Sequence, residues 1–257
     1  MNLIAVDIGN TKTMLGFVRN GRIEKTWKMA THKNMLADEY VLHFNSFLSQ
    51  IQTSWDQNPV CVASVVPHIT EQLKKHTQNR KDIHFVYHES PVNFSIELPN
   101  PQSLGSDLIA AAQGALQKYP EPLIIVDAGT ATTITVVNRK KQFIGGAICP
   151  GIGISSNALF TQASALSPIQ LKLPEAFIGN KTNDAILSGI CLGHASMIEK
   201  MVERFEKELG DICTVILTGG AIEILLQSFP KRYIHAPTLT IEGLVSIYQN
   251  IQNQGAA

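Results

Sequence analysis

The sequence has few cysteines, no long apolar run and no excess of either charge. Its four cysteines, Cys61, Cys149, Cys191 and Cys213, show no C-x-x-C spacing, which excludes a disulfide framework and a zinc site. No apolar run approaches the roughly 18 residues that span a bilayer. Asp7 interrupts the short apolar stretch at the N-terminus, which is atypical of a signal peptide. We therefore expect a cytoplasmic protein without a membrane partner.

The charged residues are balanced, with 21 Lys and Arg against 21 Asp and Glu. No basic stripe is present that would contact a phosphate backbone, so we expect no nucleic acid partner. The densest basic stretch, 138–141, lies between two strand-like runs and is interpreted as a hairpin turn. A chain of 257 residues, 44% of them hydrophobic, fits one large domain or two of about 100–150 residues.

One short phrase occurs twice in the chain. D-I-G-N-T (7–11) ends the apolar run 3–6, and D-A-G-T-A (127–131) ends the apolar run 123–126. The offset is 127 − 7 = 120 positions, close to half of the 257 residues. A buried strand that ends in this way holds a carboxylate at its carboxyl end, and the glycine turn lets backbone N–H groups approach phosphate closely. The repeat indicates two like domains that close over a nucleotide and its metal.

The order of the expected elements supports two α/β halves, each with a three-strand meander followed by helices and further strands. In the first half we expect a turn at Val66-Pro67-His68. In the second half we expect a long helix from near Asp184 to Leu209. Pro120-Glu121-Pro122 marks the boundary, so the predicted domains are residues 1–119 and 120–257.

Asp7 and Asp127 are expected to face each other across a cleft at the carboxyl ends of their strands, where α/β folds place ligands. Two approaching carboxylates repel each other unless they share a proton or a cation. Hydrated Mg²⁺ is the natural cation, because it keeps its waters and takes only one or two carboxylates. The alternative is that each Asp merely caps its own turn.

Three glycine turns supply the candidates for binding the phosphates or the nucleotide. The candidates are Gly9, Asn10, Thr11 and Thr13 in the first turn, Gly129, Thr130 and Thr132 in the second, and Gly219 and Gly220 in the third. Lys12 either adds a charge to the first turn or is solvated. The third turn, Thr218-Gly219-Gly220, is placed where a base or ribose would lie.

Asp107 follows Gly105-Ser106 and opens an expected helix. One interpretation is helix capping by Ser106 or Asp107, which is common. The other is a general base held near the acceptor hydroxyl of a phosphoryl transfer, a reaction that otherwise needs mainly positioning and charge neutralisation. The spacing alone leaves both interpretations open.

The chain resembles the type III pantothenate kinases, which include the Bvg accessory factors and belong to the acetate and sugar kinase/Hsp70/actin superfamily. The motifs that carry the resemblance are, in order, DIGNTKTMLG (7–16), ASVVP (63–67), NPQSLGSD (100–107), DAGTATT (127–133), GGAICPGI (145–152), IGNKTNDAILSG (178–189), LTGG (217–220) and IEGL (241–244). The resemblance implies two similar actin-like, ribonuclease H-like domains with mixed central sheets and a nucleotide cleft between them. It also implies ATP-dependent phosphorylation of pantothenate at the entry to coenzyme A biosynthesis, by a homodimer whose active site lies at the subunit interface.

The resemblance also implies residue roles. Asp107 matches the catalytic base, and Asp7 with the Gly9–Thr11 loop matches the phosphate and Mg²⁺ element, with Mg²⁺ held through water. Asp127 matches a carboxylate linked to phosphate and to a monovalent cation, K⁺ or NH₄⁺. Thr182 matches a threonine that reaches pantothenate across the dimer. The substrate side is completed by Leu98, Gly105, Ser106 and Leu108.

Two residues on the substrate side depart from the family pattern. The family typically has Arg where this chain has Leu108, and often an aromatic residue where it has Leu98. Losing an ionic hydrogen bond to a substrate carboxylate costs about 1.5–3 kcal/mol, roughly 10- to 150-fold in binding. Lys172 and Lys181 are candidates to replace the missing charge. The alternatives are therefore a non-catalytic or weakly active nucleotide-binding paralogue of the Bvg accessory factor type, or a kinase for a different small hydroxylated acceptor.

Overall fold

The computed structural model describes residues 2–255, which form two compact units. Unit 1 is the chain up to Lys118 together with the segment from Thr238, and unit 2 is Tyr119–Pro237. The first boundary is one residue from the predicted one. The C-terminal segment, however, groups with unit 1, whereas the predicted domain 120–257 included it.

Within the residues that the structure describes, unit 1 contains six strands, four α-helices and two 3-10 turns. Its strands are β1 (Asn2–Ile8), β2 (Lys12–Arg19), β3 (Arg22–Ala30), β4 (Val60–Ser64), β5 (Ile83–Phe85) and β6 (Ser95–Ile96). Its α-helices are α1 (Ala37–Ser49), α2 (Pro67–His76), α3 (Ser106–Leu116) and α8 (Leu239–Gly255), and its 3-10 turns are η1 (Trp55–Gln57) and η2 (Pro101–Ser103).

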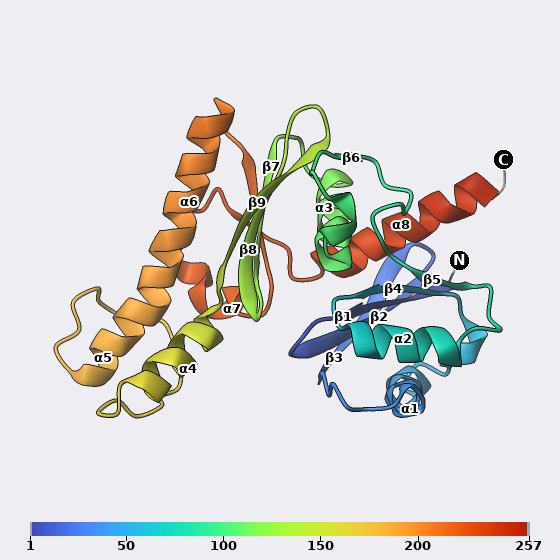
Figure 1. Ribbon diagram of the computed structural model, residues 1–257, viewed down its shortest axis with the longest axis horizontal. Coiled ribbons are helices and arrows are strands. Elements are labelled where there is room, and N and C mark those ends of the chain that lie inside the picture. Colours follow the sequence, from blue (N-terminus) through green and yellow to red (C-terminus); the bar gives the residue numbers. More distant parts are fainter. Residues whose placement is uncertain (1, 256–257) are drawn as a thin grey trace. The chain divides into compact units, whose positions relative to one another are not determined.

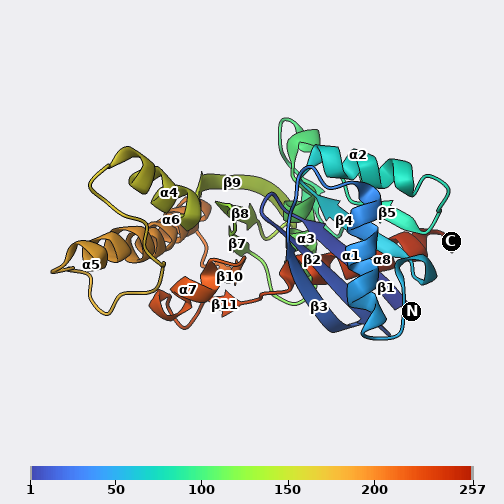
Figure 2. The same ribbon diagram turned by 90° about the horizontal axis from the view of Figure 1, so that it is seen from below.

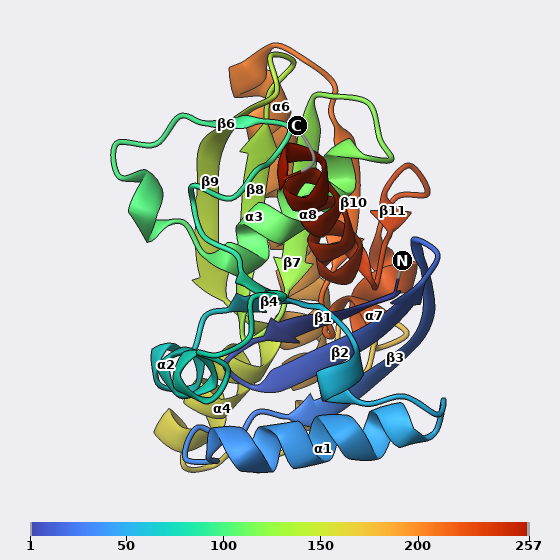
Figure 3. The same ribbon diagram turned by 90° about the vertical axis from the view of Figure 1, so that its right-hand side faces the viewer.

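The sheet of unit 1 has the strand order β3-β2-β1-β4-β5, with the first three strands antiparallel and β1, β4 and β5 parallel. Helices α1 and α2 cover one face of this sheet and α3 and α8 the other (Figures 1 and 3). Tyr40 and Phe44 of α1 are buried in the same cluster as Val6 of β1 and Leu73 of α2. The predicted turn at Val66-Pro67-His68 is wrong, because α2 begins at Pro67, a position where the missing N–H costs no helical hydrogen bond.

Helix α8 belongs to unit 1 because its backbone packs directly on α3. A Cβ on Gly243 would lie 1.7 Å from the Ala110 carbonyl oxygen, and one on Gly114 would lie 2.4 Å from the Leu239 carbonyl oxygen. The Gln113 side chain of α3 also donates to the Ser246 hydroxyl at 2.8 Å. Only residues without a side chain permit helices to approach this closely.

Unit 2 contains five strands and four α-helices. Its strands are β7 (Leu123–Ala128), β8 (Ala131–Val137), β9 (Gln142–Pro150), β10 (Thr214–Thr218) and β11 (Ile234–His235). Its helices are α4 (Ile152–Gln162), α5 (Thr182–Leu187), α6 (Gly193–Leu209) and α7 (Ile222–Leu225), with a π-helical turn, η3 (Ser188–Leu192), and a 3-10 turn, η4 (Leu226–Ser228).

The strands of unit 2 repeat the arrangement of unit 1. They lie in the order β9-β8-β7-β10-β11, with β7, β8 and β9 antiparallel and β7, β10 and β11 parallel. The stretch 138–141 forms the β8–β9 turn, as predicted. The α/β class with two similar units and mixed sheets is therefore confirmed.

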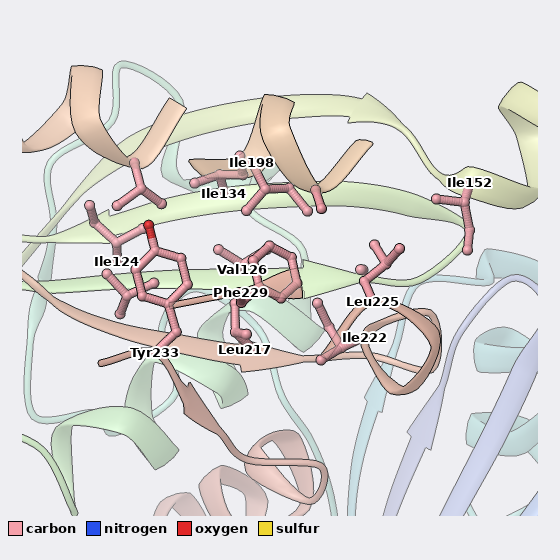
Figure 4. Close-up of a cluster of buried hydrophobic side chains, with 14 of the residues drawn as sticks. Ile124, Val126, Ile134, Ile152, Ile198, Leu217, Ile222, Leu225, Phe229 and Tyr233 are labelled. Atoms are coloured by element: carbon pink, nitrogen blue, oxygen red, sulfur yellow. The ribbon is translucent and has the colours of Figure 1, made fainter. Parts of the chain in front are cut away.

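The core of unit 2 lies between its strands and α6. Figure 4 shows Val126 and Ile134 of the strands packed with Ile198 of α6, and Phe229 and Tyr233 close the cluster. Figure 2 shows α6 extending beside α4 and α5 in this unit. The apolar face of α6 is thus buried against the sheet.

By length and composition alone, one helical stretch of the described residues, Thr182–Leu209, is long and apolar enough to cross a membrane, contrary to the expectation from the sequence. It has 28 residues, and its most apolar part, with a mean hydropathy of 1.2, is 44% buried inside the protein. Cys191, Ala195 and Val202 from this stretch lie in the unit 2 core. A helix that packs in a protein core can have the same length and hydropathy as a membrane span, because its buried face is apolar.

Candidate active site

The first candidate element is the hairpin between β1 and β2. Asp7 is the penultimate residue of β1, and the Gly9-Asn10-Thr11 loop follows it. The Gly9 N–H donates to the Lys12 carbonyl at 3.0 Å, and a Cβ on Gly9 would lie 3.1 Å from that oxygen. Asn10, Thr11 and Lys12 are exposed, so the loop offers solvent-accessible polar groups directly after the carboxylate.

The hairpin between β7 and β8 in unit 2 is built in the same way. Asp127 is the penultimate residue of β7, and the Gly129 N–H donates to the Ala131 carbonyl at 3.0 Å. Gly129 and Thr130 are exposed. Each unit therefore carries one strand-end Asp followed by a glycine whose N–H donates back across the turn, to the third residue after it in unit 1 and to the second in unit 2. Such turns are suited to anions.

The hydroxyls of Thr13 and Thr132, both predicted to contact phosphate, point into their own units. Thr13 is buried with its Oγ1 2.9 Å from that of Thr31. Thr132 is fully buried with its Oγ1 2.9 Å from Nε2 of His194 on α6. Desolvation lowers the pKa of His194, which favours the neutral ring. Both hydroxyls are thus engaged in holding the hairpins, and direct phosphate contact by them stays a prediction.

The third glycine turn follows β10 and lies against Asp127. Thr218 pairs with Asp127 in the sheet register. Gly219 has a φ of +91°, and a Cβ there would lie 2.4 Å from Oδ1 of Asp127 and 2.6 Å from the Ala128 backbone. Only glycine fits this position, since both the dihedral and the space exclude a side chain. Gly220 follows as an exposed residue.

Asp107 lies in the first turn of α3. Its Oδ1 accepts the Leu108 N–H at 2.8 Å, and a Cβ on Gly105 would lie 2.4 Å from the same oxygen. Burial raises the pKa of Asp107 above its ordinary value of 3.8, although backbone N–H groups of Leu108 and Asp107 act against it. A carboxylate with a raised pKa is a stronger proton acceptor, as a general base requires.

Asp7 and Asp107 are connected within unit 1 through the end of β4. In the parallel β1–β4 pair, Asp7 stands beside Ala63 and Ile8 beside Ser64. The hydroxyl of Ser106 bonds to both backbone groups of Ser64. The start of α3 is therefore fixed at the same end of the sheet as Asp7. The predicted facing of Asp7 and Asp127 across a nucleotide cleft concerns two different units and stays a prediction.

The substrate-side residues are distributed over both units. Leu98 and Leu108 are half-buried residues of unit 1, and Leu108 is in the first turn of α3 beside Asp107. Thr182 is exposed as the first residue of α5 in unit 2. Lys172 and Lys181, the candidates for a compensating charge, are also exposed in unit 2.

The donor groups at the two hairpins suit hard cations. Within residues 2–255, no group of three or more His, Cys, Asp or Glu side chains is arranged to hold a metal. Mg²⁺ bound through one carboxylate, water and phosphate needs no such group. The backbone of Gly219 approaches Asp127 Oδ1 closely, because glycine carries no side chain that would lie between them.

Three residues with a bearing on the site were not anticipated from the sequence. They are His194, Ser64 and Thr133. Thr133 pairs with Asp127 across the β7–β8 ladder, so the two side chains share a face, and its buried hydroxyl has no hydrogen-bond partner within the described residues. The sequence could have indicated Thr133, because successive side chains of a strand point to opposite faces of the sheet. In β8 this alternation puts Thr133, and not Thr132, on the same face as Asp127.

Comparisons with known proteins add to this geometry. The family model described as type III pantothenate kinase matches residues 3–204. The type III pantothenate kinase of Roseiflexus sp. (strain RS-1) is 36% identical over 251 residues, covering 96% of this chain and 98% of that protein. The corresponding protein of Brevibacillus brevis is 34% identical over 256 residues, covering 98% of this chain and 100% of that protein.

A solved structure at lower identity shows the same fold. A protein of Campylobacter jejuni assigned to the Baf family of transcriptional activators superposes with a TM-score of 0.64 at 23% identity, over 97% of this chain and 99% of that chain. At this identity the likeness is evidence for the fold alone. The activator of the 2-hydroxyisocaproyl-CoA dehydratase from Clostridium difficile superposes with a TM-score of 0.55 at 12% identity, over 100% of this chain and 98% of that chain, and likewise shows the fold alone.

Proposed function

The chain belongs to the type III pantothenate kinase family, and we propose that it transfers the γ-phosphate of ATP to the terminal hydroxyl of pantothenate, the first step of coenzyme A biosynthesis. The observation that carries the proposal is the pair of similar hairpins, in which Asp7 and Asp127 are each the penultimate residue of a strand and precede a turn closed by a glycine N–H. Phosphoryl transfer needs such anion-binding turns more than it needs covalent chemistry.

Asp107 acts as the general base. Its carboxylate takes the proton of the terminal hydroxyl while the hydroxyl oxygen forms its bond to the γ-phosphorus. The bond between the γ-phosphorus and the β–γ bridging oxygen breaks, and ADP leaves with that oxygen. The raised pKa of Asp107 supports this role, because a carboxylate with a higher pKa is a stronger base towards the proton of the hydroxyl.

The glycine turns bind the nucleotide in this proposal. Gly9, Asn10 and Thr11 bind phosphate in unit 1, with Lys12 adding positive charge. Gly129 and Thr130 do the same in unit 2, and Gly219 and Gly220 contact the base or ribose. Asp7 would hold Mg²⁺ through water, and Asp127 the monovalent cation, K⁺ or NH₄⁺. When bound, these cations neutralise charge on the phosphates.

The acceptor side is completed by a second copy of the chain. We assign Thr182 of that copy to pantothenate, together with Leu98, Gly105 and Leu108, in a homodimer with its active site at the interface. Leu108 supplies no charge for the pantothenate carboxylate, so affinity for the acceptor depends on other residues. The cytoplasm, which supplies ATP and keeps thiols reduced, suits the four free cysteines.

A coupled ADP-release assay tests the proposal. We expect ADP release to require pantothenate and to increase with K⁺, with phosphopantothenate detected by mass spectrometry. ATP binding without turnover at millimolar pantothenate and K⁺ would contradict the proposal and favour a nucleotide-binding accessory factor. Faster turnover of a neutral hydroxylated acceptor would favour a different kinase, an outcome that Leu98 and Leu108 would explain.

A further inference from the structure

The Ser106 side chain forms two hydrogen bonds to the backbone of a single residue in another element. Its Oγ accepts the Ser64 N–H at 2.8 Å and donates to the Ser64 carbonyl at 3.0 Å. Ser106 is only 7% exposed, so this hydroxyl is not presented to a ligand. The resemblance places Ser106 on the substrate side, but its hydroxyl forms its hydrogen bonds with the Ser64 backbone.

The position of Ser64 explains why a hydroxyl is needed there. Val60 and Val62 of β4 bond to the β5 side, through the Asp82 carbonyl and the Val86 N–H. Ser64 is two residues further on and faces the same side, but the β4–β5 pairing ends at Val62. The Ser106 hydroxyl therefore satisfies the two backbone groups for which β5 no longer offers partners.

The other side of the β4 end is attached to the phosphate hairpin. The Val65 N–H donates to the Ile8 carbonyl at 3.1 Å, and Ile8 directly follows Asp7. A continuous series of bonds thus runs from the Asp7 strand through Ser64 to Ser106. Asp107 is the next residue, and its carboxylate lies against Gly105.

We infer that Ser106 is a positioning residue, whose hydroxyl fixes the first turn of α3 on the end of β4 and so sets the place of the Asp107 carboxylate relative to the Asp7 hairpin. The inference rests on the proposed function, in which Asp107 is the base. Misplacement of a reacting group by about 1 Å can cost about 100-fold in rate. Loss of the hydroxyl should therefore affect turnover and not nucleotide binding.

The test is a double-mutant cycle of Ser106→Ala with Asp107→Asn. We expect Ser106→Ala to lower kcat about 10- to 100-fold, with the KM for ATP changed less than about threefold. In the Asp107→Asn background, Ser106→Ala should change kcat less than about twofold, because Ser106 acts through Asp107. Multiplicative losses in the cycle, or an unchanged kcat in Ser106→Ala, would overturn the inference.

Thr77→Val is the matched control, since it removes another buried hydroxyl of unit 1, which donates to the Leu73 carbonyl at 2.7 Å. It should lose thermal stability without loss of kcat. If Ser106→Ala does not fold, Ser106→Cys offers the same readouts with a similar side-chain volume.

Amide hydrogen exchange at Ser64 separates this inference from the proposed function, because it needs no substrate. In Ser106→Ala the Ser64 amide should exchange about tenfold faster or more. Unchanged exchange would overturn the attachment of α3 to β4. A wild-type chain that forms no phosphopantothenate would instead overturn the proposed function, and with it the kinetic role of Ser106, while the exchange result would still show the attachment.

Discussion

The Nε2 atom of His194 on α6 lies 2.9 Å from Oγ1 of Thr132 on β8, and both side chains are buried. The contact ties the helix that covers the unit 2 sheet to the strand that follows the second glycine turn. Because burial lowers the pKa of His194, the ring is neutral in the folded protein near pH 7.

This burial gives unit 2 a pH-dependent stability. When the pH is below 6.5, the ordinary pKa of histidine, His194 is protonated in the unfolded chain but stays neutral in the folded chain until the pH reaches its lowered pKa. The free energy of unfolding should therefore be fully retained above about pH 6.5 and decrease as the pH falls towards the lowered pKa. Urea unfolding from about pH 8 to pH 5 should show a smaller decrease for His194→Gln than for wild type. His43→Gln, which changes an exposed histidine, is the control and should show the wild-type decrease. An equal dependence of the free energy of unfolding on pH in wild type and His194→Gln would contradict the prediction.

Gly105→Ala should displace the Asp107 carboxylate. The added Cβ would lie 2.4 Å from Oδ1, closer than a real contact permits, so the side chain must rotate away. We expect kcat for pantothenate phosphorylation to fall about 10- to 100-fold with little change in the KM for ATP. Gly153→Ala, whose Cβ would meet nothing within 4 Å, should leave steady-state kinetics unchanged. A Gly105→Ala enzyme with wild-type kcat would show that the carboxylate position is not critical.

Leu108→Arg should strengthen the acceptor site. Leu108 is half-buried in the first turn of α3, and an arginine there would offer a guanidinium to the pantothenate carboxylate. An ionic hydrogen bond of about 1.5–3 kcal/mol predicts a KM for pantothenate lower by roughly 10- to 150-fold. Leu108→Met serves as the control without charge. An unchanged KM in Leu108→Arg would contradict this prediction and indicate that the carboxylate already has a cationic partner, for which Lys172 and Lys181 are the candidates.

Gly243→Ala should destabilise unit 1. Its Cβ would lie 1.7 Å from the Ala110 carbonyl oxygen, so α3 and α8 must separate. Overpacking of this kind costs about 1–3 kcal/mol, which in a chain of this size lowers Tm by roughly 2–12 °C. Gly189→Ala, whose Cβ meets nothing within 4 Å, is the control. Equal thermal melts for Gly243→Ala and wild type would show that the helices yield without cost.

The two halves and their hairpins could be predicted because their signals are local. An apolar run that ends in Asp-x-Gly predicts both a strand and the turn after it. The recurrence of this motif 120 positions later predicts the second unit. The turn prediction at Pro67 was wrong, because proline is favourable both in turns and at the first position of a helix, and Pro67 begins α2.

The features that the sequence did not predict depend on contacts between distant residues. The place of α8 in unit 1 follows from the approach of Gly243 to α3, more than 100 residues earlier in the chain. The partners of Thr132 and Ser106, His194 and Ser64, are 62 and 42 residues away. Hydroxyls that the sequence assigned to ligands are used inside each unit for this reason.

The pH dependence of turnover tests Asp107 directly. A protonated carboxyl cannot accept the hydroxyl proton, so activity should be lost as the pH falls through the pKa of Asp107. Because burial raises that pKa, the acidic limb of kcat/KM should lie above pH 3.8, the ordinary Asp value. Asp107→Asn should lower kcat about 100- to 10,000-fold and abolish this limb.

The control for this experiment is Asp38→Asn, which changes an exposed carboxylate that pairs with His76 at 2.7 Å. It should keep both the wild-type rate and the wild-type limb, with circular dichroism confirming a folded chain across the pH range. Full activity in Asp107→Asn would remove Asp107 from the role of base. An acidic limb at or below pH 3.8 would instead show that the carboxyl group is more hydrated in the working enzyme than its contacts with Gly105 and Leu108 imply.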